Sequence, residues 1–369
     1  MAESSYRIHR PVRNVYAHSY VLLVLLSFAI SVVGTRLFLE ITGYPQLGND
    51  TLHIAHALWG GLLLVVASGL TLTYLNQWVF RLAAICAGTG VGLFIDEVGK
   101  FITQTNDYFF PLAAPLIYVF FLLAVFVYLY VRRGKTTDAR AEMYAVLSVI
   151  QEVLDDNLEV SEREYLIERL RHVQRTGERR DLSALATALL QFIESDAAVV
   201  IPDQSTLYQR LMNRWQAFED RVFTRRTMRW LIVLALALVS VSAITQLTLL
   251  TSLLFDRDAL DHSVFLLILE TNPLVRGPAS FQWFLVSIAL ELLMGGLLVV
   301  SLLLMLRGWE TAAIRFGSSA LVLSLTINNI LKFYFNQFSV VAESILLFLV
   351  LMMLLRYQNR FLADYPPAL

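Results

Sequence analysis

The sequence of 369 residues contains a single cysteine, Cys86, and few charged residues, which make up 16% of the chain. One cysteine excludes an intramolecular disulfide and any cysteine-rich zinc or iron–sulfur site. The sequence also lacks the glycine-rich loops of nucleotide-binding proteins, and its net charge of −1 provides no basic surface for nucleic acid. These absences argue against a nucleotide-dependent enzyme and against a nucleic-acid-binding protein.

Apolar residues dominate the chain instead. They make up 57% of it, and the mean hydropathy is +0.61, whereas soluble domains contain about 45–50% apolar residues. A helix that crosses the bilayer core needs about 20 apolar residues. The sequence therefore predicts an all-α polytopic membrane protein with eight transmembrane helices. The runs long enough to cross are 17–40, 52–75, 79–103, 111–132, 229–255, 281–306, 312–334 and 337–356.

A polar segment divides the eight runs into two sets of four. We predict a first membrane repeat over 1–133, a soluble helical insert over 134–228 and a second membrane repeat over 229–369. The insert shows apolar residues at helical spacing, which predicts about four helices. It is interpreted either as a bundle that links the two halves or as a module that binds a cytoplasmic protein partner. Four helices are expected in the insert. They are residues 141–154, a helix that follows a capping box formed by Ser161 and Glu164, a helix capped by Asp181, and residues 205–223.

Basic residues flank the runs on alternate connections, which predicts the orientation. Cytoplasmic loops carry an excess of lysine and arginine, so both termini and the insert are expected in the cytoplasm. The protein is expected in the plasma membrane. The first run has no small-residue cleavage site after it and is interpreted as an uncleaved span. The basic residues are Arg7, Arg10, Arg13, Arg81, Arg132, Arg133, Lys135, Arg225, Arg226, Arg229, Arg307, Arg315, Arg356 and Arg360.

Two sequence matches between the halves predict an internal repeat. Residues 56–66 resemble 291–301, and residues 95–101 resemble 327–333, in the same order and at nearly the same offset. Four spans per unit give both units the same orientation, as in parallel-repeat transporters. The predicted 4+4 repeat pairs His56 with Glu291, Asp96 with Asn328, Glu97 with Asn329 and Lys100 with Lys332.

Charged residues inside the third run are the strongest functional signal. Asp96, Glu97 and Lys100 occur where each charge costs at least about 2.5 kcal/mol near the bilayer centre. An ion pair between Asp96 and Lys100, four residues apart, would lower that cost. The simpler interpretation is that the lysine extends to the interface with Asp96 as its partner. That interpretation leaves Glu97 unexplained, so we favour a functional site.

Histidines add a second signal at the start of the second span. His53 and His56 are three residues apart, and on one helix this spacing places two imidazoles on one face, where they can hold a divalent metal or share a proton. His262, in the loop after the fifth span, could complete a metal site with three histidines. The simpler alternative is a pair of interfacial histidines bonded to a loop or to lipid headgroups.

Three functions follow from these patterns. The first is transport of an ion, a proton or a small polar solute; the second is a metal-dependent, membrane-embedded hydrolase or transferase that acts on lipid, with Asp96 or Glu97 activating water; the third is a membrane sensor or scaffold that signals through the insert. No catalytic residue or solute is identified by sequence alone. The candidate residues are His53, His56, Asp96, Glu97, Lys100, Glu291, Asn328, Asn329 and Lys332, with His53, His56 and His262 as the metal set.

Overall fold

The structure is a computed structural model that describes most of the chain. It covers residues 10–43, 48–49, 52–53, 55–108, 110–133, 138–154, 158–176, 179–195, 198–202, 223–255 and 278–362. For residues 48–49, 52–53, 152, 242–255, 278–279 and 339 it describes the backbone alone. The helices of the described part are accompanied by a short antiparallel pair of strands, β1 (Gly48–Asn49) and β2 (Leu52–His53).

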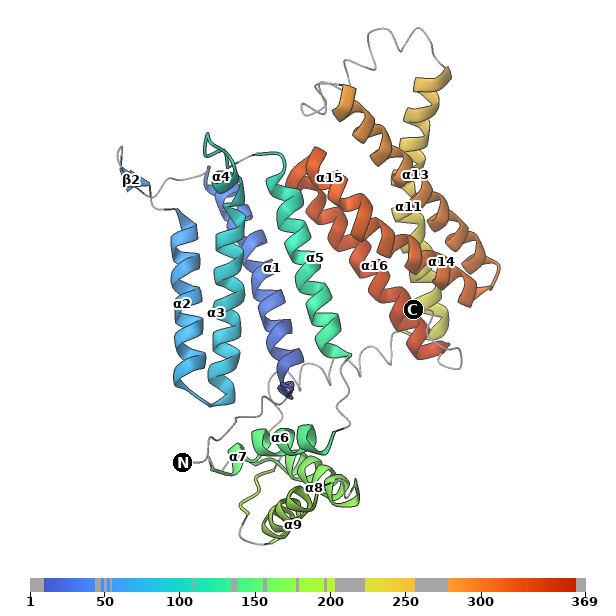
Figure 1. Ribbon diagram of the computed structural model, residues 1–369. Helices are drawn as coiled ribbons and strands as arrows, with labels where there is room; N and C mark the ends of the chain where they lie inside the picture. Colours follow the sequence, from blue (N-terminus) through green and yellow to red (C-terminus); the bar gives the residue numbers. More distant parts are fainter. Residues whose placement is uncertain are drawn as a thin grey trace. The chain divides into compact units, whose positions relative to one another are not determined.

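Seven helical segments are long and apolar enough to cross a membrane. Within each span at most 44% of the most apolar window is buried inside the protein, so most of its side chains face outward, as expected where lipid surrounds the helices. The predicted helical membrane architecture is therefore supported. The segments are α1 (Ala17–Thr42), α2 (His56–Thr73), α3 (Gln77–Asp96), α5 (Ala113–Arg132), α13 (Pro278–Leu306), the continuous segment Glu310–Asn336, and α16 (Val340–Phe361) (Figure 1).

The segment Glu310–Asn336 consists of three parts, α14 (Glu310–Leu323), the π-helix η1 (Ser324–Asn328) and α15 (Asn329–Asn336). A short 3-10 helix, η2 (Gln337–Ser339), joins it to α16. The expected span over 229–255 coincides with the helix α11 (Arg225–Phe255). The count of eight spans and the 4+4 repeat remain predictions.

Glycines allow the helices of the first half to approach closely. A Cβ atom at Gly60 of α2 would lie 2.6 Å from the Gly90 carbonyl oxygen and 2.9 Å from the Phe94 amide nitrogen of α3. At Gly88 of α3, a Cβ atom would lie 2.3 Å from the Val24 carbonyl oxygen of α1. Small residues are the usual means of such backbone contact between membrane helices. The contact at Gly60 places the start of α2 beside the end of α3.

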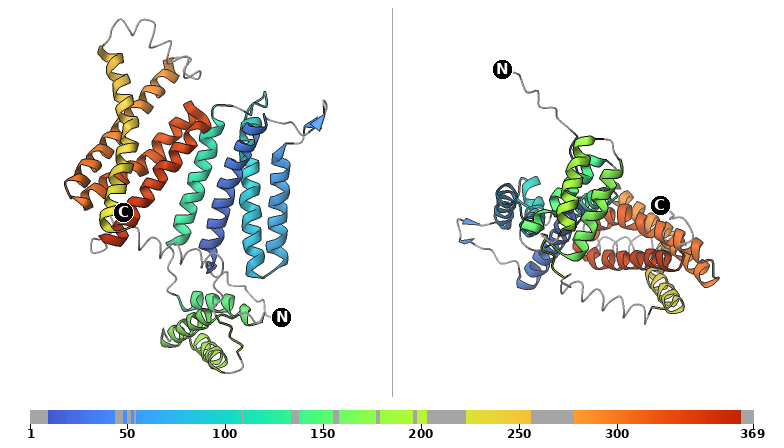
Figure 2. Two further views of the ribbon diagram at one scale, coloured as in Figure 1. Left: turned by 180° about the vertical axis from the view of Figure 1, so that it is seen from behind. Right: turned by 90° about the horizontal axis from the view of Figure 1, so that it is seen from below.

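The described helices of the insert lie together (Figure 2), and they share a hydrophobic core. Its helices are α6 (Ala139–Val149), α7 (Gln151–Leu154), α8 (Val160–Thr176) and α9 (Arg180–Glu194). The core side chains Val146, Leu158, Leu166, Leu170 and Ile193 are each 0% exposed. Such a core indicates that α6, α8 and α9 pack mainly against one another.

Two details of the insert differ from expectation. The helix α8 begins at Val160, before the expected capping box, because the Glu162 carboxylate accepts the Glu159 amide, with 3.1 Å between the two atoms. Asp181 lies inside the first turn of α9 and pairs with Arg179 instead of capping the helix. Most of the expected helix over 205–223 lies outside the described residues.

The chain divides into two compact units. One comprises 1–30, 63–89 and 124–214 and includes most of the insert; the other comprises 31–62, 90–123 and 215–369. The second unit holds all of the candidate residues in the described ranges, including those from the first half of the chain. The predicted domain boundaries at 133 and 228 remain predictions.

The predicted orientation can be tested by labelling with a membrane-impermeant maleimide. In a Cys86→Ala background, a cysteine at Gly48 of β1 should react in intact cells, whereas a cysteine at Asp181 should react only after permeabilisation, because the basic loops are expected inside. The background protein without cysteine is the control. Equal labelling of both positions in intact cells would contradict the topology.

Candidate functional site

A break between two helices shapes the first group of polar residues. The helix α3 ends at Asp96, Glu97 adopts a turn conformation with φ −89° and ψ 11°, and the chain continues as the short helix α4 (Val98–Ile102). The run predicted as one span over 79–103 is thus interrupted. Gly99 allows the loop that returns to α5 to approach α4 closely, because a Cβ atom there would lie 2.7 Å from the carbonyl oxygen of Asp107.

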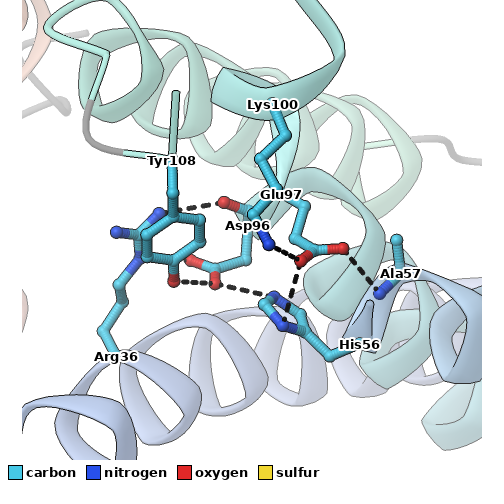
Figure 3. Close-up of polar contacts among 7 residues, drawn as sticks. All are labelled: Arg36, His56, Ala57, Asp96, Glu97, Lys100 and Tyr108. Atoms are coloured by element: carbon cyan, nitrogen blue, oxygen red, sulfur yellow. Dashed lines mark hydrogen bonds and ion pairs between the residues drawn. The ribbon is translucent and has the colours of Figure 1, made fainter. Parts of the chain in front are cut away.

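Asp96 is the side chain with the most hydrogen-bond partners at the break. It is 0% exposed. The Arg36 Nε atom donates to its Oδ1 atom over 2.5 Å, and the Tyr108 hydroxyl donates to its Oδ2 atom over 2.7 Å (Figure 3). The Arg36 Nη2 atom also donates to the backbone carbonyl of Asp96 over 2.9 Å. An arginine of α1 therefore neutralises this buried carboxylate.

Two aromatic rings enclose the Arg36 guanidinium. Its central carbon lies 4.0 Å from the ring centroid of Tyr108 and 4.2 Å from that of Phe338. Phe338 follows Gln337, whose positive φ of 49° makes the sharp turn between α15 and η2. Cation–π contacts of this kind offset part of the cost of removing the guanidinium from water. Arg36 therefore connects α1 to the turn that precedes α16.

Glu97 is also 0% exposed and accepts two hydrogen bonds. The Lys100 Nζ atom donates to its Oε1 atom over 2.6 Å, and the Ala57 amide in the first turn of α2 donates to its Oε2 atom over 3.1 Å. The first turn of a helix has free amide groups and a partial positive charge, so it stabilises a carboxylate. Lys100 thus pairs with Glu97, whereas the sequence predicted a pair with Asp96.

His56 lies between the two carboxylates. Its Nε2 atom is 3.0 Å from Asp96 Oδ2, and its Nδ1 atom is 3.4 Å from Glu97 Oε1 (Figure 3). A neutral imidazole has one donor and one acceptor nitrogen, and ionised carboxylates only accept. Both contacts are hydrogen bonds only when the ring carries two protons or one carboxyl carries a proton. The arrangement therefore provides a place for one additional proton.

The chain matches no protein-family model, no curated protein and no solved structure.

We refer to the six residues Arg36, His56, Asp96, Glu97, Lys100 and Tyr108 as the His56 cluster. With a neutral ring, its two cations balance its two carboxylates. A second proton on the ring leaves one positive charge in excess. The carboxylates are buried, whereas the side chains of His56 and Lys100 are 23% and 24% exposed, so these two residues form the accessible edge.

A second polar group lies in the C-terminal half. The Lys332 Nζ atom is 3.0 Å from Glu291 Oε1 of α13 and 2.7 Å from Glu343 Oε1 of α16. Lys332 is thus in contact with Glu291, one of the predicted site residues. We refer to Glu291, Asn328, Asn329, Lys332 and Glu343 as the Lys332 cluster.

The π-helix η1 lies directly beside this second cluster. The Asn329 amide donates to the Ser324 carbonyl, five residues back, instead of to Leu325. The Leu325 carbonyl is left to accept the hydroxyl of Tyr118 from α5. Single π turns within helices are frequent at functional sites. The break at Glu97 and this π turn both depart from α-helix geometry at residues that the sequence predicted for the site.

The structure describes only part of the predicted metal set His53, His56 and His262. His53 lies in β2 and the helix begins at His56, so the expected shared helical face does not form. The side chain of His53 and the whole of His262 lie outside the described residues. Within the described part of the chain, no group of three histidine, cysteine, aspartate or glutamate residues is arranged to hold a metal ion.

Sequence reasoning missed Arg36, Tyr108 and Glu343. Arg36 and Glu343 each occur near one end of an apolar run, where the signal used for Asp96 applies, but neither was included among the candidates. Tyr108 follows α4 in a connecting loop, and nothing in the sequence indicates that it folds back onto Asp96.

Proposed function

We propose that the protein is a membrane transporter in which the His56 cluster takes up and releases a proton, either as the transported ion or coupled to an ion or small polar solute. The observation that carries the proposal is the His56 ring with a carboxylate oxygen at each nitrogen. Histidine is the side chain whose charge changes most readily near neutral pH.

Burial and access support the same function. Two carboxylates, an arginine and a lysine at the ends of membrane helices are costly, and such residues usually mark ion or proton pathways. The partial exposure of His56 and Lys100 gives protons a route to the buried carboxylates. With the topology predicted from the basic loops, this route opens on the extracytoplasmic side of the plasma membrane.

The contacts of His56 favour proton transfer over metal-dependent hydrolysis of lipid. A histidine binds a metal through a ring-nitrogen lone pair. Both ring nitrogens of His56 face carboxylate oxygens, and each carboxylate already accepts hydrogen bonds from other groups. A metal at His56 would have to replace one of these contacts.

Proteoliposomes that contain a pH-sensitive dye would test the proposal. We expect a membrane potential, alone or with one of a panel of amino acids, carboxylates and inorganic ions, to drive proton flux through the protein. His56→Gln should reduce the flux to that of protein-free liposomes, because the amide cannot carry the transferred proton. The matched control is His172→Gln in the insert, which should keep the wild-type rate.

Two results would contradict the proposal. One is a proton flux that His56→Gln leaves unchanged. The other is the absence of flux with every probe, although the protein inserts and remains folded in the liposomes.

A further inference from the structure

We propose that the Lys332 cluster binds a monovalent alkali cation through the amide oxygens of Asn328 and Asn329, close to the carboxylates of Glu291 and Glu343. The proposal does not depend on proton transport, because it concerns a different group of side chains and is tested by binding alone. Its first support is that both amide oxygens are buried and accept no hydrogen bond from the described part of the chain.

The orientation of the Asn329 amide is fixed by its neighbours. Its Nδ2 atom donates to the Ser344 hydroxyl over 2.8 Å and to the Tyr118 hydroxyl over 3.4 Å. Each hydroxyl uses its own hydrogen for a backbone carbonyl, that of Val340 or of Leu325, and therefore acts as an acceptor toward Asn329. Turning the amide over would place its oxygen against two acceptors. The Oδ1 atom is therefore the unpartnered one.

Asn328 lies on the lysine side of the same helix. It precedes Lys332 by four residues, a spacing that places two side chains on one helix face. Lys332 contacts both carboxylates of the cluster, so this face is directed toward α13 and α16. Asn328 and Asn329 are only 1% and 0% exposed. A buried carbonyl oxygen without a donor costs about 1–3 kcal/mol, which a bound cation would offset.

The charges of the cluster specify the kind of ligand. Glu291 and Glu343 carry two negative charges against the single positive charge of Lys332, so the cluster has one negative charge in excess. Amide and carboxylate oxygens are the ligands that hard cations prefer. One excess charge matches a monovalent ion, whereas calcium sites use several carboxylates. The side chain of Glu343 is 38% exposed and gives the ion a way in.

The irregular helix supports the same inference. Single π turns within α-helices are frequent at functional sites. The π-helix ends at Asn328, and Asn329 follows it directly. The two amides that present unpartnered oxygens are therefore those at the end of the π turn.

Thermal unfolding of the purified protein in detergent tests the site. At constant pH and ionic strength, we expect the unfolding midpoint to rise and level off as sodium or potassium chloride replaces choline chloride, because a ligand of the folded state stabilises it. Asn328→Leu and Glu343→Gln should each abolish this dependence. Because Glu343 is partly exposed, Glu343→Gln should disturb folding less than Asn328→Leu. Equilibrium binding of radioactive sodium should likewise be found for the wild-type protein and be lost in both variants.

The matched control is Gln77→Leu. Gln77 also has a buried, unpartnered amide atom, but it is the nitrogen Nε2, which cannot bind a cation. This variant should keep the wild-type cation dependence. Equal midpoints in choline, sodium and potassium would overturn the proposal and leave a water molecule as the partner of the amide oxygens. Cation dependence that survives in both cluster variants, or a response to calcium alone, would overturn it too.

Discussion

Arg36→Met should lower the free energy of unfolding by about 3–5 kcal/mol, because it leaves the Asp96 carboxylate buried without its cation. Asp96 is 0% and Arg36 is 8% exposed, so water cannot replace the lost partner. Chemical or thermal unfolding in detergent micelles would measure the loss. The same substitution removes the guanidinium that two aromatic rings enclose.

The double variant Arg36→Met/Asp96→Asn separates the ion pair from the packing. Since it removes both charges, we expect it to be more stable than Arg36→Met alone. The control is Arg171→Met, because Arg171 lies 2.8 Å from Glu194, the two side chains are 54% and 42% exposed, and exposed pairs of this kind contribute about 0–1 kcal/mol. If the losses in the free energy of unfolding caused by Arg36→Met alone and by Asp96→Asn alone sum to the loss in the double variant, Arg36 and Asp96 do not stabilise each other.

Gly60→Ala should destabilise the protein strongly, whereas Gly61→Ala should not. The added methyl group at Gly60 would overlap the backbone of α3, with Gly90 and Phe94 at 2.6 and 2.9 Å, and overpacking costs about 1–3 kcal/mol. At Gly61 nothing lies within 4 Å, and alanine favours the helix by up to about 1 kcal/mol. The two unfolding midpoints should therefore move in opposite directions.

Proton flux provides a second measurement for the same pair. Separation of α2 from α3 at Gly60 would also move His56 away from Asp96, so Gly60→Ala should lose flux and Gly61→Ala should keep it. Equal stability of the two variants would show that α2 and α3 are not in backbone contact.

The helical membrane architecture could be predicted because a bilayer core requires long apolar runs. The predicted run 17–40 corresponds to α1 (Ala17–Thr42) and 111–132 to α5 (Ala113–Arg132). The interruptions could not be predicted in this way. Neither Glu97 nor Asn328 is a helix-breaking residue, and both irregular turns are accompanied by tertiary contacts, such as that between Tyr118 and the Leu325 carbonyl.

The candidate site was predictable where a charge lies within an apolar run. The antiparallel arrangement of consecutive spans then accounts for the contact of His56 with Asp96 and Glu97. The ion partners of the carboxylates were not predictable. Arg36 comes from a span distant in sequence, and the turn at Glu97 changes the direction in which Lys100 points. Spacing rules for a regular helix cannot describe either contact.

The π turn also changes the helical phase of the segment that contains it. An α-helix advances by 3.6 residues per turn, and a π turn includes about one residue more. Residues after Asn328 are therefore rotated relative to those before Ser324, by about the angle that one residue occupies in a regular helix. The part before the π turn contributes Ile314 and Leu321 to the core of the C-terminal half, and the part after it contains Lys332. The two parts can thus pack against different neighbours. One helix can consequently combine two packing registers along its length.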